Sequence, residues 1–158
     1  MKSNYNRAYC ILAGIVLVTF IVLYKVLEIK EPDMVQIRQS IIETADITTM
    51  DEGDALKLRK LYYINKNDVE EFILYSPKTN MDANEILILK AKSEKDVDEL
   101  KSKIEGRVEK QSNSFKSYRP EEYEIISDRV LEVKGEYLIL IISKDSKEIK
   151  TAIDKNFR

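Results

Sequence analysis

Arg107 and Gln111 are residues whose types and spacing could bind a ligand. They are four positions apart in a segment, 93–115, whose apolar residues recur at helical spacing, so both side chains lie on one side of the predicted helix. Gln111 falls within the apolar stripe and Arg107 at its edge. A guanidinium beside an amide could hold a small anion or a peptide carboxylate. The simpler interpretation, which we favour, is that Gln111 hydrogen-bonds to backbone, because most side-chain hydrogen bonds go to backbone or water.

The stretch SFKSYRPEEYE, Ser114 to Glu124, adds Tyr118 as a third candidate contact. Pro120 disfavours helical geometry at the residue before it and suits the first turn of a helix, so this stretch predicts a break followed by a short helix. We favour a joint at which its three aromatic residues cover the core. The alternative is a binding site formed by the three candidate ligand or partner contacts, Arg107, Gln111 and Tyr118.

Residue types that many enzyme mechanisms need are missing from this sequence. It contains no His, and its only Cys, Cys10, lies in an apolar run near the amino terminus. Imidazole acid-base chemistry, thiol catalysis and zinc sites built on His are therefore excluded. No S-x-x-K or G-x-S-x-G motif occurs, and the few glycines are too scattered to form a phosphate-binding loop. We expect no enzyme activity, no catalytic residue, no cofactor and no metal site.

The run AYCILAGIVLVTFIVLY, residues 8–24, contains no charge and predicts a transmembrane helix that extends to Leu27. A cleaved signal peptide is the alternative, but no A-x-A cleavage pattern follows the run. A short basic tail precedes it, which favours an amino terminus inside the cell. We expect a short cytoplasmic tail at 1–7, a transmembrane signal anchor at 8–27 and an extracytoplasmic domain at 28–158. The chain would then be a single-pass protein of the cell membrane.

The charge balance limits the partners of residues 28–158, which carry 23 basic and 28 acidic residues. Nucleic acids and anionic lipids are drawn to clustered positive charge, so neither is the expected main partner. We expect contact with the membrane through the N-terminal helix alone. An unidentified cell-envelope protein is the other expected partner.

Apolar runs in two pairs predict the strands of this domain. EEFILYS and EILILKA are separated by a turn-rich segment, and the pair 130–134 and 137–143 is separated by a tight turn at Gly135. Helical spacing predicts helices over 34–45 and 93–115, and at the carboxyl end. Acidic residues followed by basic ones, the order that the helix dipole favours, predict a shorter helix over 51–61. The expected fold class is α+β: a mostly antiparallel four-stranded sheet built from two hairpins, with packed helices, behind one N-terminal transmembrane helix.

Two strand segments, 86–89 and 138–142, are apolar at successive positions, so both faces of these strands must be covered. We expect them to be central in the sheet. The helix from Ser93 and the final helix are expected to pack on one face. The two helices between Pro32 and Leu61 are expected to cover at least part of the other face.

The segments ANEILILKAK, EGRVEKQSNSFKSYRPEEYE and VKGEYLILIISKD resemble a family of small exported or membrane-attached bacterial domains of unknown function, found mainly in Firmicutes. In that family an Arg, a Gln four residues later, an aromatic, a Tyr-x-Pro and a Gly-x-Tyr strand turn recur. Many members resemble lipoproteins, with a Cys after the signal, and this chain departs from them there. The resemblance implies no known activity. The matching residues here are Arg107, Gln111, Phe115, Tyr118, Pro120, Gly135 and Tyr137.

Two functions of different classes therefore stay open. The favoured one is a non-catalytic interaction module at the bacterial cell surface, anchored in the membrane. The alternative is a small-ligand-binding or carboxylate-dependent enzymatic domain with a site near Arg107, Gln111 and Tyr118. A pocket lined by convergent polar groups would favour the alternative, and a filled joint would favour the interaction module.

Overall fold

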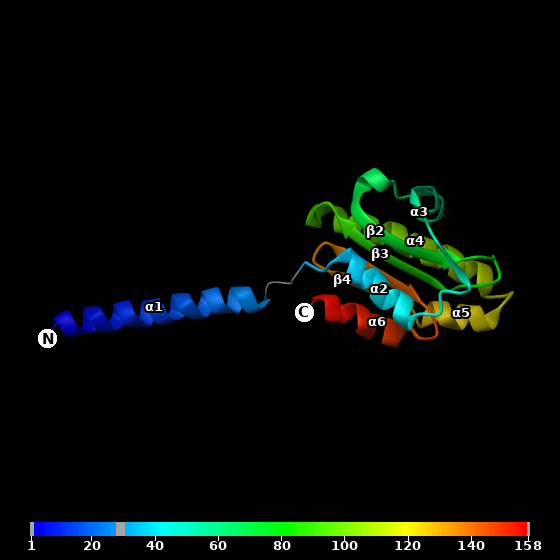
Figure 1. Cartoon of the computed structure of the whole chain (residues 1–158). Helices are drawn as coiled ribbons and strands as arrows, with labels where there is room; N and C mark the ends of the chain where they lie inside the picture. The colour runs from blue at the N-terminus through cyan, green and yellow to red at the C-terminus, as the bar shows by residue number, and fades with distance from the viewer. Residues whose placement is uncertain (1, 28–30, 158) are drawn as a thin grey trace. The chain divides into compact units, whose positions relative to one another are not determined.

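The structure is a computed structural model that describes residues 2–27 and 31–157, with side chains within the first range only at 9 and 11–23 (Figure 1). The chain divides into two compact units, Met1–Glu31 and Pro32–Arg158. The second unit is an α+β domain. Its elements are α2 (Met34–Thr44), β1 (Met50–Glu52), α3 (Ala55–Tyr62), β2 (Val69–Pro77), β3 (Glu85–Ala91), α4 (Val97–Phe115), α5 (Pro120–Ser127), β4 (Val130–Lys134), β5 (Tyr137–Ile142) and α6 (Ser146–Asp154), with three short 3₁₀ turns.

The first unit contains one helix, α1 (Lys2–Leu27). Among the residues that the structure describes, no helix is long and apolar enough to cross a membrane. The expected fold class included a transmembrane helix at 8–27, and this part of the expectation is therefore wrong.

The sheet has five strands in the order β1-β2-β3-β5-β4, and every neighbouring pair is antiparallel. The two predicted hairpins are confirmed as β2–β3 and β4–β5, and Gly135 takes a left-handed φ of 56° in the turn between the latter two strands. The expectation of four strands is wrong. The additional strand is β1, which pairs with the end of β2 at an edge of the sheet.

The strand β1 overlaps the predicted start of the helix over 51–61. Gly53 lies so close to β2 that a Cβ atom built on it would be 2.6 Å from Leu74 Cδ2, and its N–H donates to the Leu74 carbonyl at 2.8 Å. The helix α3 begins only after Asp54, whose side chain accepts from the Lys57 N–H as an N-cap. Pairing with β2 thus overrides the local helical preference of Asp51 and Glu52.

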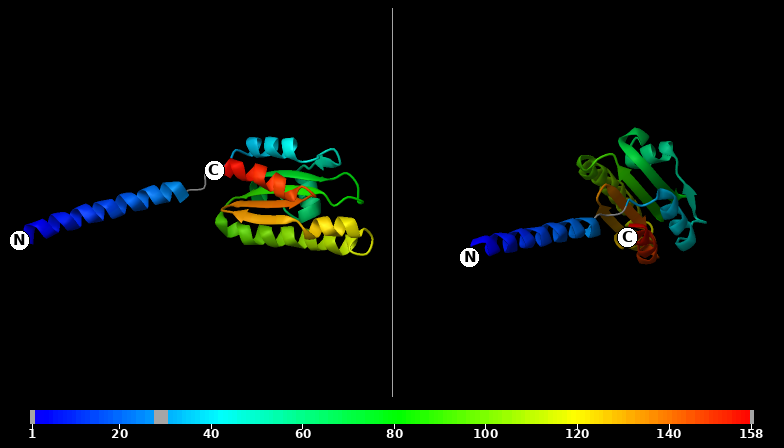
Figure 2. Two further views of the ribbon diagram at one scale, coloured as in Figure 1. Left: turned by 90° about the horizontal axis from the view of Figure 1, so that it is seen from below. Right: turned by 60° about the vertical axis from the view of Figure 1, so that its left-hand side comes forward.

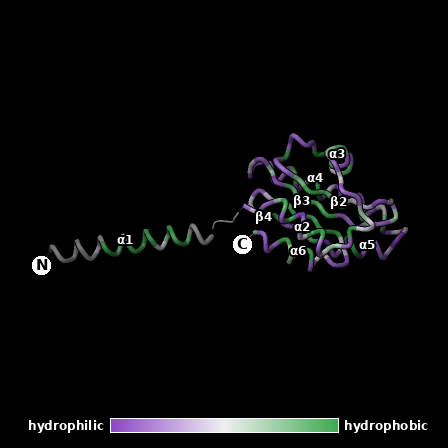
Figure 3. Tube along the Cα trace, viewed as in Figure 1, coloured by the Kyte–Doolittle hydropathy of each residue, from purple (hydrophilic) through white to green (hydrophobic). Residues whose placement is uncertain are grey.

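Alternation along the central strands creates two separate hydrophobic cores, and Figure 3 shows hydrophobic residues concentrated on these strands. In β3, Leu87 and Leu89 lie in one core and Ile86 and Ile88 in the other. All residues of β3 and β5 are buried. The expected central position of these two strands is confirmed.

Helices cover both faces of the sheet, so the domain has three layers, which the view from below in Figure 2 shows most clearly. One core includes buried residues of α3, α4 and α5, and the other includes buried residues of α2 and α6. The expected coverage by α2 is confirmed, with Ile37 and Ile41 completely buried. The expected partition is otherwise wrong, because α6 packs beside α2 and not beside α4, while α3 packs on the α4 face.

Candidate functional site

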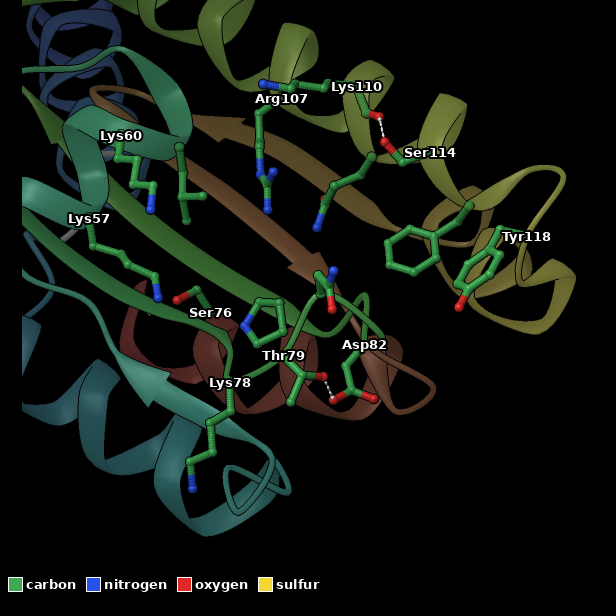
Figure 4. A pocket seen from close by; sticks show the side chains of 15 residues that line it. Lys57, Lys60, Ser76, Lys78, Thr79, Asp82, Arg107, Lys110, Ser114 and Tyr118 are labelled. Carbon is green, nitrogen blue, oxygen red and sulfur yellow. Dashed lines mark hydrogen bonds between the residues drawn. The ribbon is translucent and has the colours of Figure 1, made fainter.

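A pocket of about 560 Å³ lies on the α4 face of the sheet (Figure 4). The helix α3 forms one wall, α4 and the joint after it form the opposite wall, and the end of β2 with the following loop forms the floor. This volume is within the usual range for sites that bind small molecules. The lining residues are Lys57, Lys60, Leu61, Ser76, Pro77, Lys78, Thr79, Asn80, Asp82, Arg107, Lys110, Gln111, Ser114, Phe115 and Tyr118.

Positive charge dominates this pocket, although the chain as a whole carries a net charge of −2. In Figure 4 the charged ends of Lys57, Lys60 and Arg107 point towards the region around the Ser76 hydroxyl. Lys78 instead extends away and donates to the Thr48 carbonyl at 2.7 Å. The lining contains five basic side chains and one carboxylate, so it presents a positive site on an acidic domain.

A buried carboxylate, Glu85 at the start of β3, fixes the position of Arg107. Glu85 is fully buried and accepts from Arg107 Nη2 at 2.7 Å and from Arg107 Nε at 3.3 Å. Gln111 Nε2 donates to the same carboxylate at 3.2 Å, and the Tyr62 hydroxyl donates to its other oxygen. Three side chains from α3 and α4 therefore satisfy one buried charge. The guanidinium keeps further N–H donors because only Nε and Nη2 are used.

This network shifts two pKa values. Burial alone would lower the pKa of Arg107, but its hydrogen bonds to Glu85 and the charge of that carboxylate raise it above its ordinary value. Burial raises the pKa of Tyr62 well above its ordinary value, and the adjacent Glu85 carboxylate raises it further. Arg107 is thus a permanent cation, and Tyr62 is a neutral donor.

Two buried polar atoms at the pocket have no hydrogen-bond partner among the described residues: Ser76 Oγ and Gln111 Oε1. Their residues are 0% and 4% exposed. Unsatisfied buried polar atoms are rare in folded proteins, because each costs the free energy of its lost hydration. Both belong to residues that line the same pocket.

Strand register explains why Ser76 lies beside the Glu85 network. Tyr75 pairs with Ile86 in the antiparallel ladder between β2 and β3, so Ser76 and Glu85 are the next positions on these strands. Side chains alternate along a strand, so Ser76 is on the same face as Leu74. Both the hydroxyl and the carboxylate therefore face α4.

An aromatic wall closes the end of the pocket at the joint. Phe115 is buried, whereas Tyr118 is 66% exposed and its hydroxyl lies 3.7 Å from Met81 Sδ. The expected break and the short helix beginning at Pro120 are confirmed. Phe115 covers the core and Tyr123 packs partly buried against it, but the expectation that Tyr118 does so is wrong.

Glu122 connects this joint to the loop that forms the pocket floor. It is buried, and its Oε2 accepts from the Ala83 N–H at 2.8 Å. Arg119 Nη2 lies 3.6 Å from the other carboxylate oxygen. Glu122 thus holds a loop whose neighbouring residues, such as Asp82, line the pocket.

The three residues selected from the sequence all line this pocket, so the structure brings Arg107, Gln111 and Tyr118 together. The favoured backbone partner for Gln111 is wrong, because its amide donates to Glu85. Sequence reasoning missed Glu85, although a lone carboxylate opening the apolar strand EILILKA was a usable signal. It also missed Ser76, Lys57 and Lys60, because nothing in their spacing along a strand or helix marks them as residues of a binding site.

Within the described ranges, no group of three or more His, Cys, Asp or Glu side chains could hold a metal ion. The lining residues are suited to anions and not to cations, since basic side chains and amide or hydroxyl groups predominate.

A family model described as Domain of unknown function (DUF4358) matches residues 43–143, more than half of the chain. The chain belongs to this family. All residues that line the pocket fall within the matched region of the DUF4358 domain. No curated protein matches the chain, and no solved structure matches it. The expected membership of a family of unknown function is confirmed, while the Firmicutes origin and the lipoprotein-like character of relatives stay predictions.

Proposed function

We propose that this DUF4358 domain binds a small anionic ligand in the pocket between α3 and α4, without catalysing a reaction on it. The observation that carries the proposal is the buried, unpartnered hydroxyl Ser76 Oγ beside a convergent set of cations. A bound anion would accept from the Ser76 hydroxyl and from the free Arg107 donors. The cations would attract it across the opening of the pocket.

The cations at the pocket are available to a ligand. Among the described residues, neither Lys57 nor Lys60 forms a side-chain ion pair, although ion pairs occur elsewhere on the domain, such as Lys103 with Glu99 at 2.8 Å. Arg107 is held in place by Glu85 and keeps unused N–H groups. A preorganised donor of this kind loses little side-chain entropy when an anion binds.

Binding without catalysis is the favoured form of the proposal. The buried acid-base groups of the network, Glu85 and Tyr62, are hydrogen-bonded to each other, and Glu85 also forms a salt bridge with Arg107. The sequence contains no His, and its single Cys lies outside the domain. An interaction module that recognises a cell-envelope protein stays a prediction, as does localisation outside the cytoplasm.

Titration calorimetry of the full chain against phosphate, sulfate, citrate and 3-phenylpropionate tests the proposal. At least one anion is expected to bind to the wild-type protein, and Lys57→Glu is expected to weaken it about tenfold or more by reversing a charge at the site. Lys147→Glu is the matched control, because it makes the same change on α6, on the other face of the sheet. Equal loss in both variants, or no binding of any anion, would overturn the proposal.

Ser76→Ala separates a binding role from a structural one. Since the hydroxyl has no partner in the folded protein, its removal is expected to raise the free energy of unfolding by about 1 kcal/mol. The same change is expected to weaken anion binding. A variant that is less stable and binds normally would show that Ser76 serves packing and not the ligand.

A further inference from the structure

The polar groups of the pocket restrict the chemical class of the anion further than the positive charge of the pocket does. The inference drawn below about that class rests on the proposed function. Gln111 uses its amide nitrogen to donate to Glu85. The amide oxygen is buried at the pocket and no donor among the described residues reaches it. An amide oxygen can only accept. A ligand that satisfies Gln111 must therefore bring a hydrogen-bond donor as well as an anionic group.

The required donor is expected to be neutral. The lining contains five basic side chains against the single carboxylate of Asp82, and the buried charge of Glu85 is already balanced by Arg107. An ammonium group on the ligand would lie among like charges, which disfavours binding. An amide N–H or a hydroxyl meets the requirement without this cost. An amino acid with a free amino group does not.

A third feature is the aromatic wall at the joint. Phe115 is buried and lines the pocket. Tyr118 stands largely exposed at the far end of the pocket (Figure 4). These rings offer apolar contact surface on the side of the pocket opposite Lys57 and Lys60. A ligand with an apolar side chain would cover surface here that is otherwise in water.

We infer that the pocket binds an N-acylated amino acid, which is also the chemical structure of the carboxyl-terminal residue of a peptide chain. Its carboxylate binds at Lys57, Lys60 and the free donors of Arg107. Its amide N–H donates to Gln111 Oε1, and its side chain contacts Phe115 and Tyr118. In such a ligand the carboxylate and the amide N–H are attached to the same carbon atom. Their protein partners, Arg107 and Gln111, are likewise neighbours, one turn apart on α4.

Four matched probes test this inference by calorimetry on the full chain. N-acetylphenylalanine carries all three groups, 3-phenylpropionate lacks the amide, N-acetylphenylalaninamide lacks the carboxylate, and phenylalanine replaces the amide by an ammonium. N-acetylphenylalanine is expected to bind most tightly, and each of the others about tenfold more weakly or worse, because each leaves a buried group unpaired or adds a like charge. Equal affinity for 3-phenylpropionate or for N-acetylphenylalaninamide would overturn the inference.

Gln111→Met tests the assignment of the acceptor while nearly preserving side-chain volume. The variant is expected to bind N-acetylphenylalanine and 3-phenylpropionate equally, with the affinity for 3-phenylpropionate unchanged within about twofold, which shows that the pocket is intact. If the variant still prefers N-acetylphenylalanine about tenfold, Gln111 is not the acceptor and the inference is wrong. If the variant does not fold, the wild-type ranking of the four probes decides alone.

Two further arms distinguish the source of the ligand and separate this inference from the proposed function. N-acetyl-Gly-Gly-Phe binding more tightly than N-acetylphenylalanine supports a peptide carboxyl terminus, and weaker binding of the peptide supports a free N-acyl amino acid. If phosphate or citrate binds and Lys57→Glu weakens this binding, while N-acetylphenylalanine does not bind, this inference is overturned and the proposed function stands.

Discussion

Arg107 on α4 and Glu85 on β3 form a buried salt bridge across 22 positions of sequence, with Arg107 Nη2 2.7 Å from Glu85 Oε2. The Glu85 side chain is completely buried and that of Arg107 is 14% exposed. The pair joins the centre of the sheet to the helix that forms one wall of the pocket. Arg107 therefore has a fixed orientation before any ligand binds.

Glu85→Gln is expected to destabilise the domain by about 3–5 kcal/mol, because it leaves the Arg107 charge without its buried partner. Chemical denaturation measures this change. The double variant Glu85→Leu with Arg107→Met removes both charges and is expected to recover part of the loss. A single variant as stable as the wild type would show that the pair is not buried in solution.

Tyr62→Phe is expected to lower the free energy of unfolding by about 1–3 kcal/mol at pH 8, because Glu85 loses a donor. The pKa of Tyr62 is raised in the folded protein by burial and by Glu85, so its contribution is fully present below the unfolded pKa of about 10 and is lost as the pH rises above that value. Denaturation between about pH 8 and pH 11 should show the difference between wild type and variant shrinking above pH 10. A constant difference would contradict the assignment.

Phe115→Ala and Tyr118→Ala form a matched pair at the joint. Phe115 is buried and its truncation is expected to cost about 3–5 kcal/mol. Tyr118 is largely exposed, so its truncation should change stability by about 0.5 kcal/mol or less. Denaturant midpoints test both values. A large loss of stability in Tyr118→Ala would show that Tyr118 packs in the core after all.

Ile41→Ala and Ile42→Ala test the coverage of the second sheet face by α2. Ile41 is completely buried and Ile42 is 43% exposed, although the two are adjacent and chemically identical. Ile41→Ala is expected to cost about 2–5 kcal/mol and to increase binding of a hydrophobic dye. Ile42→Ala should cost less than about 1 kcal/mol. Equal effects would mean that α2 does not pack as described.

Gly53→Ala is expected to destabilise the domain by about 1–3 kcal/mol, since the new methyl group would overlap the buried side chain of Leu74. Gly106→Ala is the control. A Cβ atom at Gly106 meets nothing within 4 Å, and the residue lies inside α4, so this substitution should stabilise by about 0.5–1 kcal/mol. Thermal unfolding of both variants provides the comparison, and a stabilised Gly53→Ala would place β1 farther from β2.

Local patterns in the sequence determined the two hairpins, the long helix α4 and the break before Pro120. Apolar runs flanked by turn residues, and apolar residues at helical spacing, depend on neighbours only a few positions away. The same kind of pattern marked Gln111 as unusual, because a polar residue interrupts an otherwise apolar stripe. These features were readable without knowing which elements pack together.

Tertiary structure alone decided the strand β1, the distribution of helices between the two faces, and the composition of the pocket. A three-residue strand is stable only through its pairing with β2, and both faces of β3 are apolar, so the sequence could not say which helix covers which face. Ser76 and Glu85 become neighbours only through register, and Lys57 reaches them only because α3 packs on their face. Such contacts depend on which surfaces meet in space, and that choice minimises exposed apolar area over the whole domain.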